Sequence, residues 1–224
     1  MAAFHASFDV PPYRFSGVVY GALLNHAPEL WALGAAVDQP PYKAAPRAPV
    51  LQVKPRNTLA GEGDAIEVPQ GVPALVMGAT LGIVMARAAC RVDASAALEF
   101  VAGYTIVNDV FVPVPNHYRP SVRLRARDGF CPLSANVCAL SEPDALRVEV
   151  HIDGQLVQQT TTGDRVRHVA QLIADVSDFM TLQVGDVLLL GASADAPLAR
   201  AGQKVEIRIE GLGSLRNHLV AEAA

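Results

Sequence analysis

The most constraining feature of this sequence is an uncharged run over residues 68–86, which holds no acidic or basic side chain. A membrane-spanning helix needs roughly 20 consecutive apolar residues. Pro69, Pro73 and Gly78 are among the residues that break this run into shorter apolar stretches. The run therefore favours a pair of buried strands over a membrane span, with residues 74–86 forming one long apolar strand.

Composition narrows the class of protein to a chain with a sizeable buried core. Of its 224 residues, 51% are hydrophobic and 18% are charged, and the formal net charge is −4. These values exclude a disordered tail and a protein that binds nucleic acid through a general basic field. The low charged fraction also indicates oligomerisation, because apolar surface has to be covered.

The cysteine content and the amino-terminal residues indicate a cellular compartment. Cys90, Cys131 and Cys138 contain no C-x-x-C pair, which is typical of a reducing compartment and disfavours a disulfide scaffold or a zinc site. Residues 1–10 have neither a basic start nor an apolar core, so the sequence predicts no signal peptide. We expect a cytoplasmic protein that binds neither membrane nor nucleic acid.

Short β-like segments dominate the chain after residue 16. The clearest hairpin spans residues 146–159, where an alternating segment reaches Asp153 and Gly154, a pair that favours a type I′ turn. Further strands are expected at 17–24, 50–53, 65–68, 103–112, 185–191 and 204–213.

Two helices complete the expected elements. Asp93 and Ser95 are candidate caps for a helix through residues 96–100. Residues 165–179 form the clearer helix, because apolar residues recur there on one face. These are Val166, Val169, Leu172, Ile173 and Val176.

The predicted fold class is mainly β with α (α+β), with a closed or rolled sheet rather than a doubly wound α/β fold. Residues 38–49 hold four prolines and are expected to form an extended connector. We therefore divide a single structural domain into an N-terminal arm, residues 1–45, and a main body, residues 46–224.

One local cluster of basic residues has two interpretations. It comprises Arg119, Arg123, Arg125 and Arg127. Such a run is usually a solvated loop. It is also suited to an anion pocket, because guanidinium groups match the geometry of carboxylates.

Five segments, in order and spacing, resemble the fumarylacetoacetate hydrolase family. They are VKPRNTLAGEGDAIEVP (53–69), AALEFVAGYTIVNDV (96–110), RDGFCPLS (127–134), VHIDGQLVQQTTTGDRV (150–166) and TLQVGDVLLLGA (181–192). The resemblance implies a mixed β-sandwich roll of the type found in the family's C-terminal domain. It also implies keto-acid chemistry through an enolate-type intermediate.

Within the family, residues 25–33, 40–58 and 77–92 are similar to the amino-terminal half of the isomerase/decarboxylases of homoprotocatechuate (4-hydroxyphenylacetate) catabolism. Such enzymes decarboxylate 5-oxopent-3-ene-1,2,5-tricarboxylate and isomerise 2-hydroxyhepta-2,4-diene-1,7-dioate. In some organisms the two halves are separate subunits, and this chain is similar to the first.

The resemblance also implies a Mg²⁺ site built from a Glu-x-Glu pair and an aspartate. Asp109 matches the aspartate, but the two glutamate positions fall on Gly78 and Thr80, between Glu67 and Asp93, where the chain has no carboxylate. One carboxylate does not replace three, so we expect the family's metal site to be broken here. Asp109 is alternatively a hydrogen-bonded residue near a strand end.

A family His-x-x-Glu dyad that serves as acid/base matches His26 and Glu29. On one helical turn the carboxylate is expected to fix the imidazole tautomer and raise its basicity. The alternative is a surface histidine beside a glutamate in the first turn of a helix.

Four further positions match family residues near the substrate. Arg125 takes the place of a lysine that binds a carboxylate, and Lys54, Asn57 and Gln158 match positions around the pocket. Lys54 is alternatively a snorkelling structural residue.

Two functional hypotheses follow. The chain is either an enzyme subunit acting on a keto acid, or a catalytically silent subunit that pairs with a metal-competent paralogue. Metal-free isomerisation by the dyad lies between them. Homo-oligomers and hetero-oligomers are both compatible with the sequence.

Overall fold

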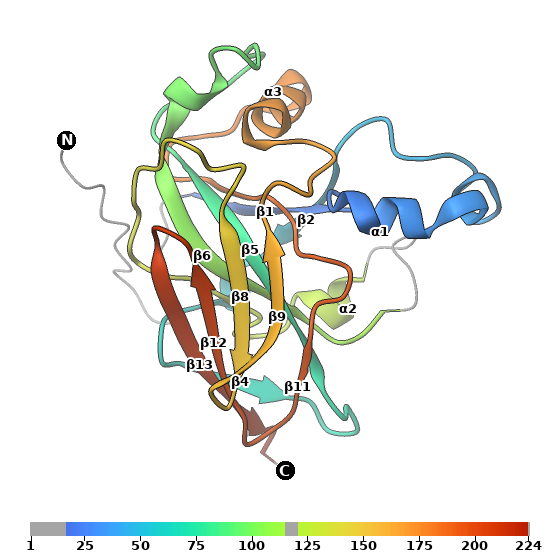
Figure 1. Cartoon of the computed structure of the whole chain (residues 1–224), viewed down its shortest axis with the longest axis vertical. Helices are drawn as coiled ribbons and strands as arrows, with labels where there is room; N and C mark the ends of the chain where they lie inside the picture. The colour runs from blue at the N-terminus through green and yellow to red at the C-terminus, as the bar shows by residue number, and fades with distance from the viewer. Residues whose placement is uncertain (1–16, 115–120, 224) are drawn as a thin grey trace.

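A computed structural model describes residues 17–114 and 121–223, which form two main sheets packed against each other (Figure 1). The six-stranded sheet contains β1 (Val19–Leu23), β2 (Val50–Lys54), β5 (Leu75–Met85), β6 (Val101–Phe111), β10 (Val187–Leu189) and β11 (Leu198–Ala199). The five-stranded sheet contains β4 (Ala65–Val68), β8 (Arg147–Ile152), β9 (Gln155–Thr161), β12 (Lys204–Ile209) and β13 (Gly213–Ala221). A small third sheet pairs β3 (Leu59–Ala60) with β7 (Cys131–Pro132).

The predicted fold class, mainly β with α, is confirmed. Both main sheets mix parallel and antiparallel pairs, with β1 parallel to β10 and β13 parallel to β4. Across the described residues neither sheet closes on itself, so the closed alternative is wrong. The strand β1, which belongs to the predicted arm, lies between β2 and β10 in the larger sheet.

The strand β5 explains the uncharged run. All of its residues are buried, and it pairs with β6 along one edge and with β10 and β11 along the other. The expected pair of strands within residues 68–86 is wrong, because only β5 lies there after the last residue of β4. Charge is absent because both edges and both faces of this strand are covered.

The two faces of β5 contact different surroundings because side chains alternate along a strand. One face joins the main core between the two sheets, through Leu75, Met77, Ala79, Leu81, Ile83 and Met85. The other face carries Val76, Gly78 and Thr80. Residues 78 and 80 therefore share a face, as the spacing of a Glu-x-Glu pair requires.

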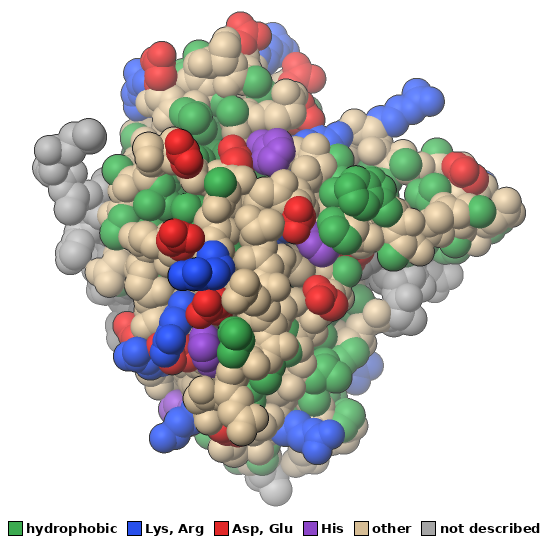
Figure 2. Space-filling model, viewed as in Figure 1, with side chains coloured by type: hydrophobic (Ala, Val, Ile, Leu, Met, Phe, Trp, Pro, Cys, Tyr) green, Lys and Arg blue, Asp and Glu red, His purple; other side chains and the backbone are tan. Residues whose placement is uncertain are grey.

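The hairpin at residues 146–159 is confirmed. β8 and β9 are antiparallel, and Asp153 (φ 51°) and Gly154 (φ 81°) both occupy the left-handed region that a type I′ turn demands. On β12, buried and more exposed residues alternate. Figure 2 shows that Lys/Arg and Asp/Glu side chains are interspersed on the face of the molecule in view.

The helix predicted over residues 165–179 forms but begins later, as α3 (Val169–Phe179). Its buried residues include Val169, Leu172, Ile173 and Val176, as predicted. Val166 precedes the helix and is 41% exposed. Residues 166 and 167 instead donate backbone hydrogen bonds to the main chain and side chain of Asn25, which ties this segment to the loop after β1.

The helix expected through residues 96–100 is present as a 3₁₀ helix, but its expected caps are wrong. A short 3₁₀ turn spans Ala97–Phe100, and neither Asp93 nor Ser95 caps it. The carbonyl of Phe100 already accepts hydrogen bonds from the amides of Ala86 and Arg87 at the end of β5, so the chain passes directly into β6.

The remaining helical elements are short. They are α1 (Ala27–Ala32), α2 (Val122–Arg125) and the 3₁₀ turns Gly34–Asp38 and Arg56–Thr58. Figure 1 shows α1 and the loop that follows it projecting from the side of the molecule. Among the described residues, no helix has the length and apolar character needed to cross a membrane.

Candidate active site

A cavity of about 230 Å³ lies beside the Gly78 face of the larger sheet. Its walls come from the end of β1, α1, β5, β6, α2 and the segment 192–196. The polar side chains that line it are Glu29, Asp109, Arg125 and Ser193. Its size suits a small metabolite, since pockets for drug-sized ligands have volumes of about 300–1,000 Å³.

One end of this cavity is a buried ionic cluster around Asp109. Lys54 Nζ donates to Asp109 Oδ1 at 2.8 Å, and Gln52 Nε2 donates to Asp109 Oδ2 at 2.7 Å. Arg125 Nη1 also donates to Oδ2, at 3.3 Å. We call Lys54, Asp109 and Arg125 the cation cluster, because two cations share one carboxylate.

Arg125 is the member of the cluster that lines the cavity. Its side chain is 6% exposed, its guanidinium lies 3.7 Å from the centre of the Phe111 ring, and its Nε has no hydrogen-bond partner. Burial lowers the pKa of Arg125, while the carboxylates of Asp109 and Glu29 oppose that change. The group therefore presents a poorly solvated cation to the cavity.

The residues at this position do not fit a divalent metal. Gly78 and Thr80 supply no carboxylate, and Thr80 Oγ1 already accepts the amide of Gly191 at 3.0 Å. Both oxygens of Asp109 are engaged by the cation cluster and Gln52. Within the described ranges, no group of three or more His, Cys, Asp or Glu side chains is arranged to hold an ion.

Gly78 also leaves no room for the missing ligand. A Cβ atom placed on this residue would lie 2.4 Å from the carbonyl oxygen of Asp109, its neighbour across the β5–β6 pair. It would also lie 3.1 Å from Cβ of Ala192. The close approach of two strands and the segment after β10 thus depends on glycine at this position.

His26 lies beside the segment 192–196 that lines the cavity, but its own side chain is not among the lining residues. This residue precedes α1, it is 5% exposed, and its Nδ1 accepts the amide of Ala194 at 3.2 Å. Burial is the largest influence on the pKa of His26, and with Arg165 it outweighs Glu29, Asp164 and Asp195, so the pKa lies below its ordinary value. The expected rise in basicity is wrong, and Ala194, rather than Glu29, holds the ring nitrogen.

The structure separates the other predicted substrate residues. Lys54 is fully buried against Asp109, so the snorkelling alternative is wrong. Gln158 is 8% exposed and donates to Asp195 Oδ1 at 3.0 Å, next to the segment that lines the cavity. Asn57 is exposed, bonds to Asp128, and lines a different hollow.

The basic cluster divides in the same way. Arg125 is buried in the cavity wall, Arg123 is exposed, and Arg127 pairs with Glu222. Arg119 lies outside the described residues.

Sequence reasoning missed two residues of this site. Gln52 lies two positions before Lys54 on β2, so strand alternation placed it on the same face as a residue already singled out. Arg165 is buried next to His26, through a backbone bridge between the two residues. No sequence pattern marks Arg165, because it is brought there by a segment far along the chain.

Known proteins of one family are similar to nearly the whole chain. The family model for the fumarylacetoacetate (FAA) hydrolase C-terminal domain matches residues 18–220. The 4-hydroxyphenylacetate degradation bifunctional isomerase/decarboxylase of Salmonella dublin is 40% identical over 206 residues, which is 92% of this chain and 48% of that protein. A homoprotocatechuate catabolism bifunctional isomerase/decarboxylase of Escherichia coli is 38% identical with the same coverage. The chain thus spans about half the length of these relatives.

Solved structures share the fold. A 5-carboxymethyl-2-hydroxymuconate delta-isomerase from Mycobacterium smegmatis superposes with a TM-score of 0.77 at 27% identity, covering 95% of this chain and 82% of that one. A fumarylpyruvate hydrolase from Pseudomonas aeruginosa, in complex with Mn²⁺ and pyruvate, gives a TM-score of 0.77 at 18% identity, covering 99% and 97%. The second likeness concerns the fold alone.

Proposed function

The chain belongs to the fumarylacetoacetate hydrolase family, and from this membership we propose that it is a cytoplasmic isomerase/decarboxylase subunit of 4-hydroxyphenylacetate (homoprotocatechuate) catabolism. Its substrates are 2-hydroxyhepta-2,4-diene-1,7-dioate, 5-oxopent-3-ene-1,2,5-tricarboxylate, or both. Support comes from the named relatives, which share 38–40% identity over 92% of the chain.

The observation that carries this proposal is the buried guanidinium of Arg125 in the cavity wall. A 2-oxo acid brings a carboxylate into the cavity, and its enolate adds a second negative charge during the reaction. Arg125 binds the carboxylate and stabilises the developing charge, since preorganised cations are most effective in a site that excludes water. Lys54 and Asp109 hold Arg125 in place.

Isomerisation makes the smaller demand on this site. The enol oxygen of the diene loses a proton, and a carbon of the conjugated chain gains one, so no atom is lost from the substrate. His26 and Glu29 are the acid/base pair for that transfer. Decarboxylation breaks a carbon–carbon bond and leaves its electron pair in an enolate, which needs more charge stabilisation than isomerisation.

The test is turnover of 2-hydroxyhepta-2,4-diene-1,7-dioate by the purified chain, followed by ultraviolet absorbance, with Mg²⁺ and separately with EDTA. We expect isomerisation in both conditions. Arg125→Gln should lose most of the activity, whereas Arg123→Gln, on the exposed side of the same short helix, should retain it. Absence of turnover in both conditions, with the folded chain alone and with its partner subunit, contradicts the proposal.

A second function is favoured by the poor fit of the described residues to a metal. In this alternative the chain is a catalytically silent subunit that pairs with a metal-competent paralogue in a hetero-oligomer. The paralogue's activity is measured with and without this chain. If the rate is unchanged and the two chains do not co-elute, the alternative is ruled out.

A further inference from the structure

Arg165 is a buried cation with little compensation. The residue is 6% exposed, and its Nη1 donates to the carbonyl oxygen of the preceding residue, Asp164, at 3.2 Å. Its Nε has no hydrogen-bond partner. Burial lowers the pKa of Arg165 to about 10, although the carboxylates of Asp164 and Glu29 oppose that change. Keeping such a group buried is costly, so its position calls for a reason.

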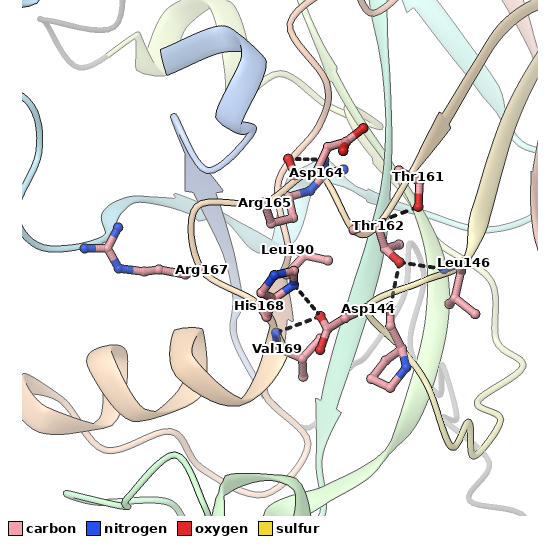
Figure 3. A network of polar contacts seen from close by, with 12 residues as sticks. Asp144, Leu146, Thr161, Thr162, Asp164, Arg165, Arg167, His168, Val169 and Leu190 are labelled. Atoms are coloured by element: carbon pink, nitrogen blue, oxygen red, sulfur yellow. Dashed lines mark hydrogen bonds and ion pairs between the residues drawn. The ribbon is translucent and has the colours of Figure 1, made fainter. Parts of the chain in front are cut away.

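Backbone bonds fix this arginine beside His26. The two residues form an antiparallel bridge, and the amide of Ala27 donates to the carbonyl of Asp164 at 3.1 Å. Figure 3 shows Arg165 turned toward Asp164, while Arg167, two residues later, extends away from it. Arg167 is paired with Asp175 on α3. The bridge thus places Arg165 opposite His26, where its charge helps to lower the pKa of the histidine, whereas Arg167 pairs with α3.

The hydrogen bond from Ala194 decides which ring nitrogen of His26 carries the proton. Because Nδ1 accepts this bond, a neutral ring has its hydrogen on Nε2. A second proton would have to displace the Ala194 amide and would place a cation next to Arg165. The groups that favour this protonation are Glu29 on α1, Asp164 beside Arg165, and Asp195 in the segment 192–196.

We infer that Arg165 is a positioning residue that keeps His26 neutral and protonated at Nε2, so that His26 donates a hydrogen bond and Glu29 accepts the proton. This inference rests on the proposed function and divides the roles of its acid/base pair, since Glu29 moves the proton and His26 donates a hydrogen bond. The enol oxygen gives its proton to the Glu29 carboxylate, which then delivers it to carbon. His26 donates to the substrate oxygen and returns unchanged, in the manner of a neutral electrophilic histidine.

The experiment follows the ring nitrogens of His26 by nuclear magnetic resonance of the full chain labelled with ¹⁵N-histidine. The chain has six histidines, so the His26→Gln spectrum identifies the signals of His26. Wild-type protein should show the Nε2–H tautomer and titrate below the ordinary value of 6.5. Arg165→Gln should move the titration upward, and Arg165→Lys, which keeps the charge, should restore the wild-type behaviour.

The matched control is Arg167→Gln, which removes a charge of the same sign two residues away and should leave the His26 titration unchanged. Should Arg165→Gln fail to fold, Arg165→Met serves in its place, since it keeps the apolar volume. The acid limb of the isomerisation pH profile should move with the His26 titration in the same variants.

A wild-type Nδ1–H tautomer, or a titration that is the same in wild type and Arg165→Gln, overturns this inference. These readouts need no turnover. The chain could instead show the expected tautomer and titration and yet fail to isomerise the diene. That result would contradict the proposed function and the catalytic use of the positioning. It would leave the effect of Arg165 on His26 intact.

Discussion

Two carboxylates in this molecule each lie between two cations, one inside and one at the surface. Asp109 is held by Lys54 and Arg125 in the cavity wall, with the three side chains 0–6% exposed. Glu206, on β12, bonds to Arg208 at 2.9 Å and to Arg216 at 2.8 Å. Those two arginine side chains are 49% and 63% exposed.

The difference between them lies in what happens to the surplus positive charge. At the surface, water solvates it, and the two arginines simply lower the pKa of Glu206 to about 2. In the cavity wall, burial instead lowers the pKa of Arg125, so keeping the surplus positive charge there costs free energy. The same charge ratio thus forms a surface ion network in one place and, in the function that we propose, an anion-binding site in the other.

Neutralising Asp109 should have the largest effect and tests whether burial distinguishes the two clusters. Asp109→Asn leaves two buried cations without a counter-ion, which should lower the free energy of unfolding by about 3–5 kcal/mol. Urea denaturation of the variant and the wild type measures the change. If Asp109→Asn were no more destabilising than Glu206→Gln, burial would not distinguish the two clusters.

Rebuilding the family's carboxylates tests whether the cation cluster excludes a metal. Because Gly78 has no space for a side chain, Gly78→Ala alone should cost about 1–3 kcal/mol of unfolding free energy. The double substitution Gly78→Glu and Thr80→Glu should gain no tight Mn²⁺ binding. Calorimetric titration with Mn²⁺ checks this, and micromolar affinity in the double variant would show that the scaffold still accepts a metal.

Acid titration extends the comparison to His26, where burial and Arg165 outweigh the nearby carboxylates. His26 has a lowered pKa in the folded chain, so the unfolded chain binds more protons between that pKa and 6.5. Wild-type stability should therefore fall as the pH drops below about 6.5, by less than the cost of Gly78→Ala. Arg165→Met should flatten this dependence, as measured by thermal unfolding between neutral and mildly acidic buffers.

The smallest effect is expected at the surface. Glu206→Gln should change the free energy of unfolding by less than about 1 kcal/mol, because solvent and salt screen exposed pairs. The contribution of Glu206 is present above its ordinary pKa of 4.5 and is lost as the pH falls toward 2. Molar salt should erase the difference between this variant and wild type. A persistent large difference would place Glu206 in the same class as Asp109.

Local patterns predicted much of the fold. Alternation and turn chemistry define the β8–β9 hairpin, and the spacing of apolar residues defines the buried face of α3. The start of α3 could not be predicted, because the bonds from residues 166 and 167 to Asn25 depend on a distant segment. The helix expected through residues 96–100 is limited to a 3₁₀ helix, because the carbonyl of Phe100 bonds to the end of β5 and β6 begins at the next residue.

The site was predictable where residues share one strand and not where they meet across the fold. Comparing Gly78, Thr80 and Asp109 with the family pattern indicated a broken metal site. Nothing in the local sequence reveals that Lys54, Gln52 and Arg125 all converge on Asp109, or that Ala194 takes the ring nitrogen of His26. These contacts join five segments of the chain, and pairwise convergence of that kind is set by the sheet topology.

The most direct test of the central claim, that a cation cluster stands where the family holds a metal, is calorimetric binding of oxalate, a compact mimic of a 2-oxo acid enolate. The full chain is titrated once in EDTA and once with Mn²⁺, and Arg125→Gln is titrated in EDTA. The claim predicts the same affinity in both wild-type titrations and loss of binding in the variant. Oxalate that binds only with Mn²⁺, or equally well to Arg125→Gln, would contradict it.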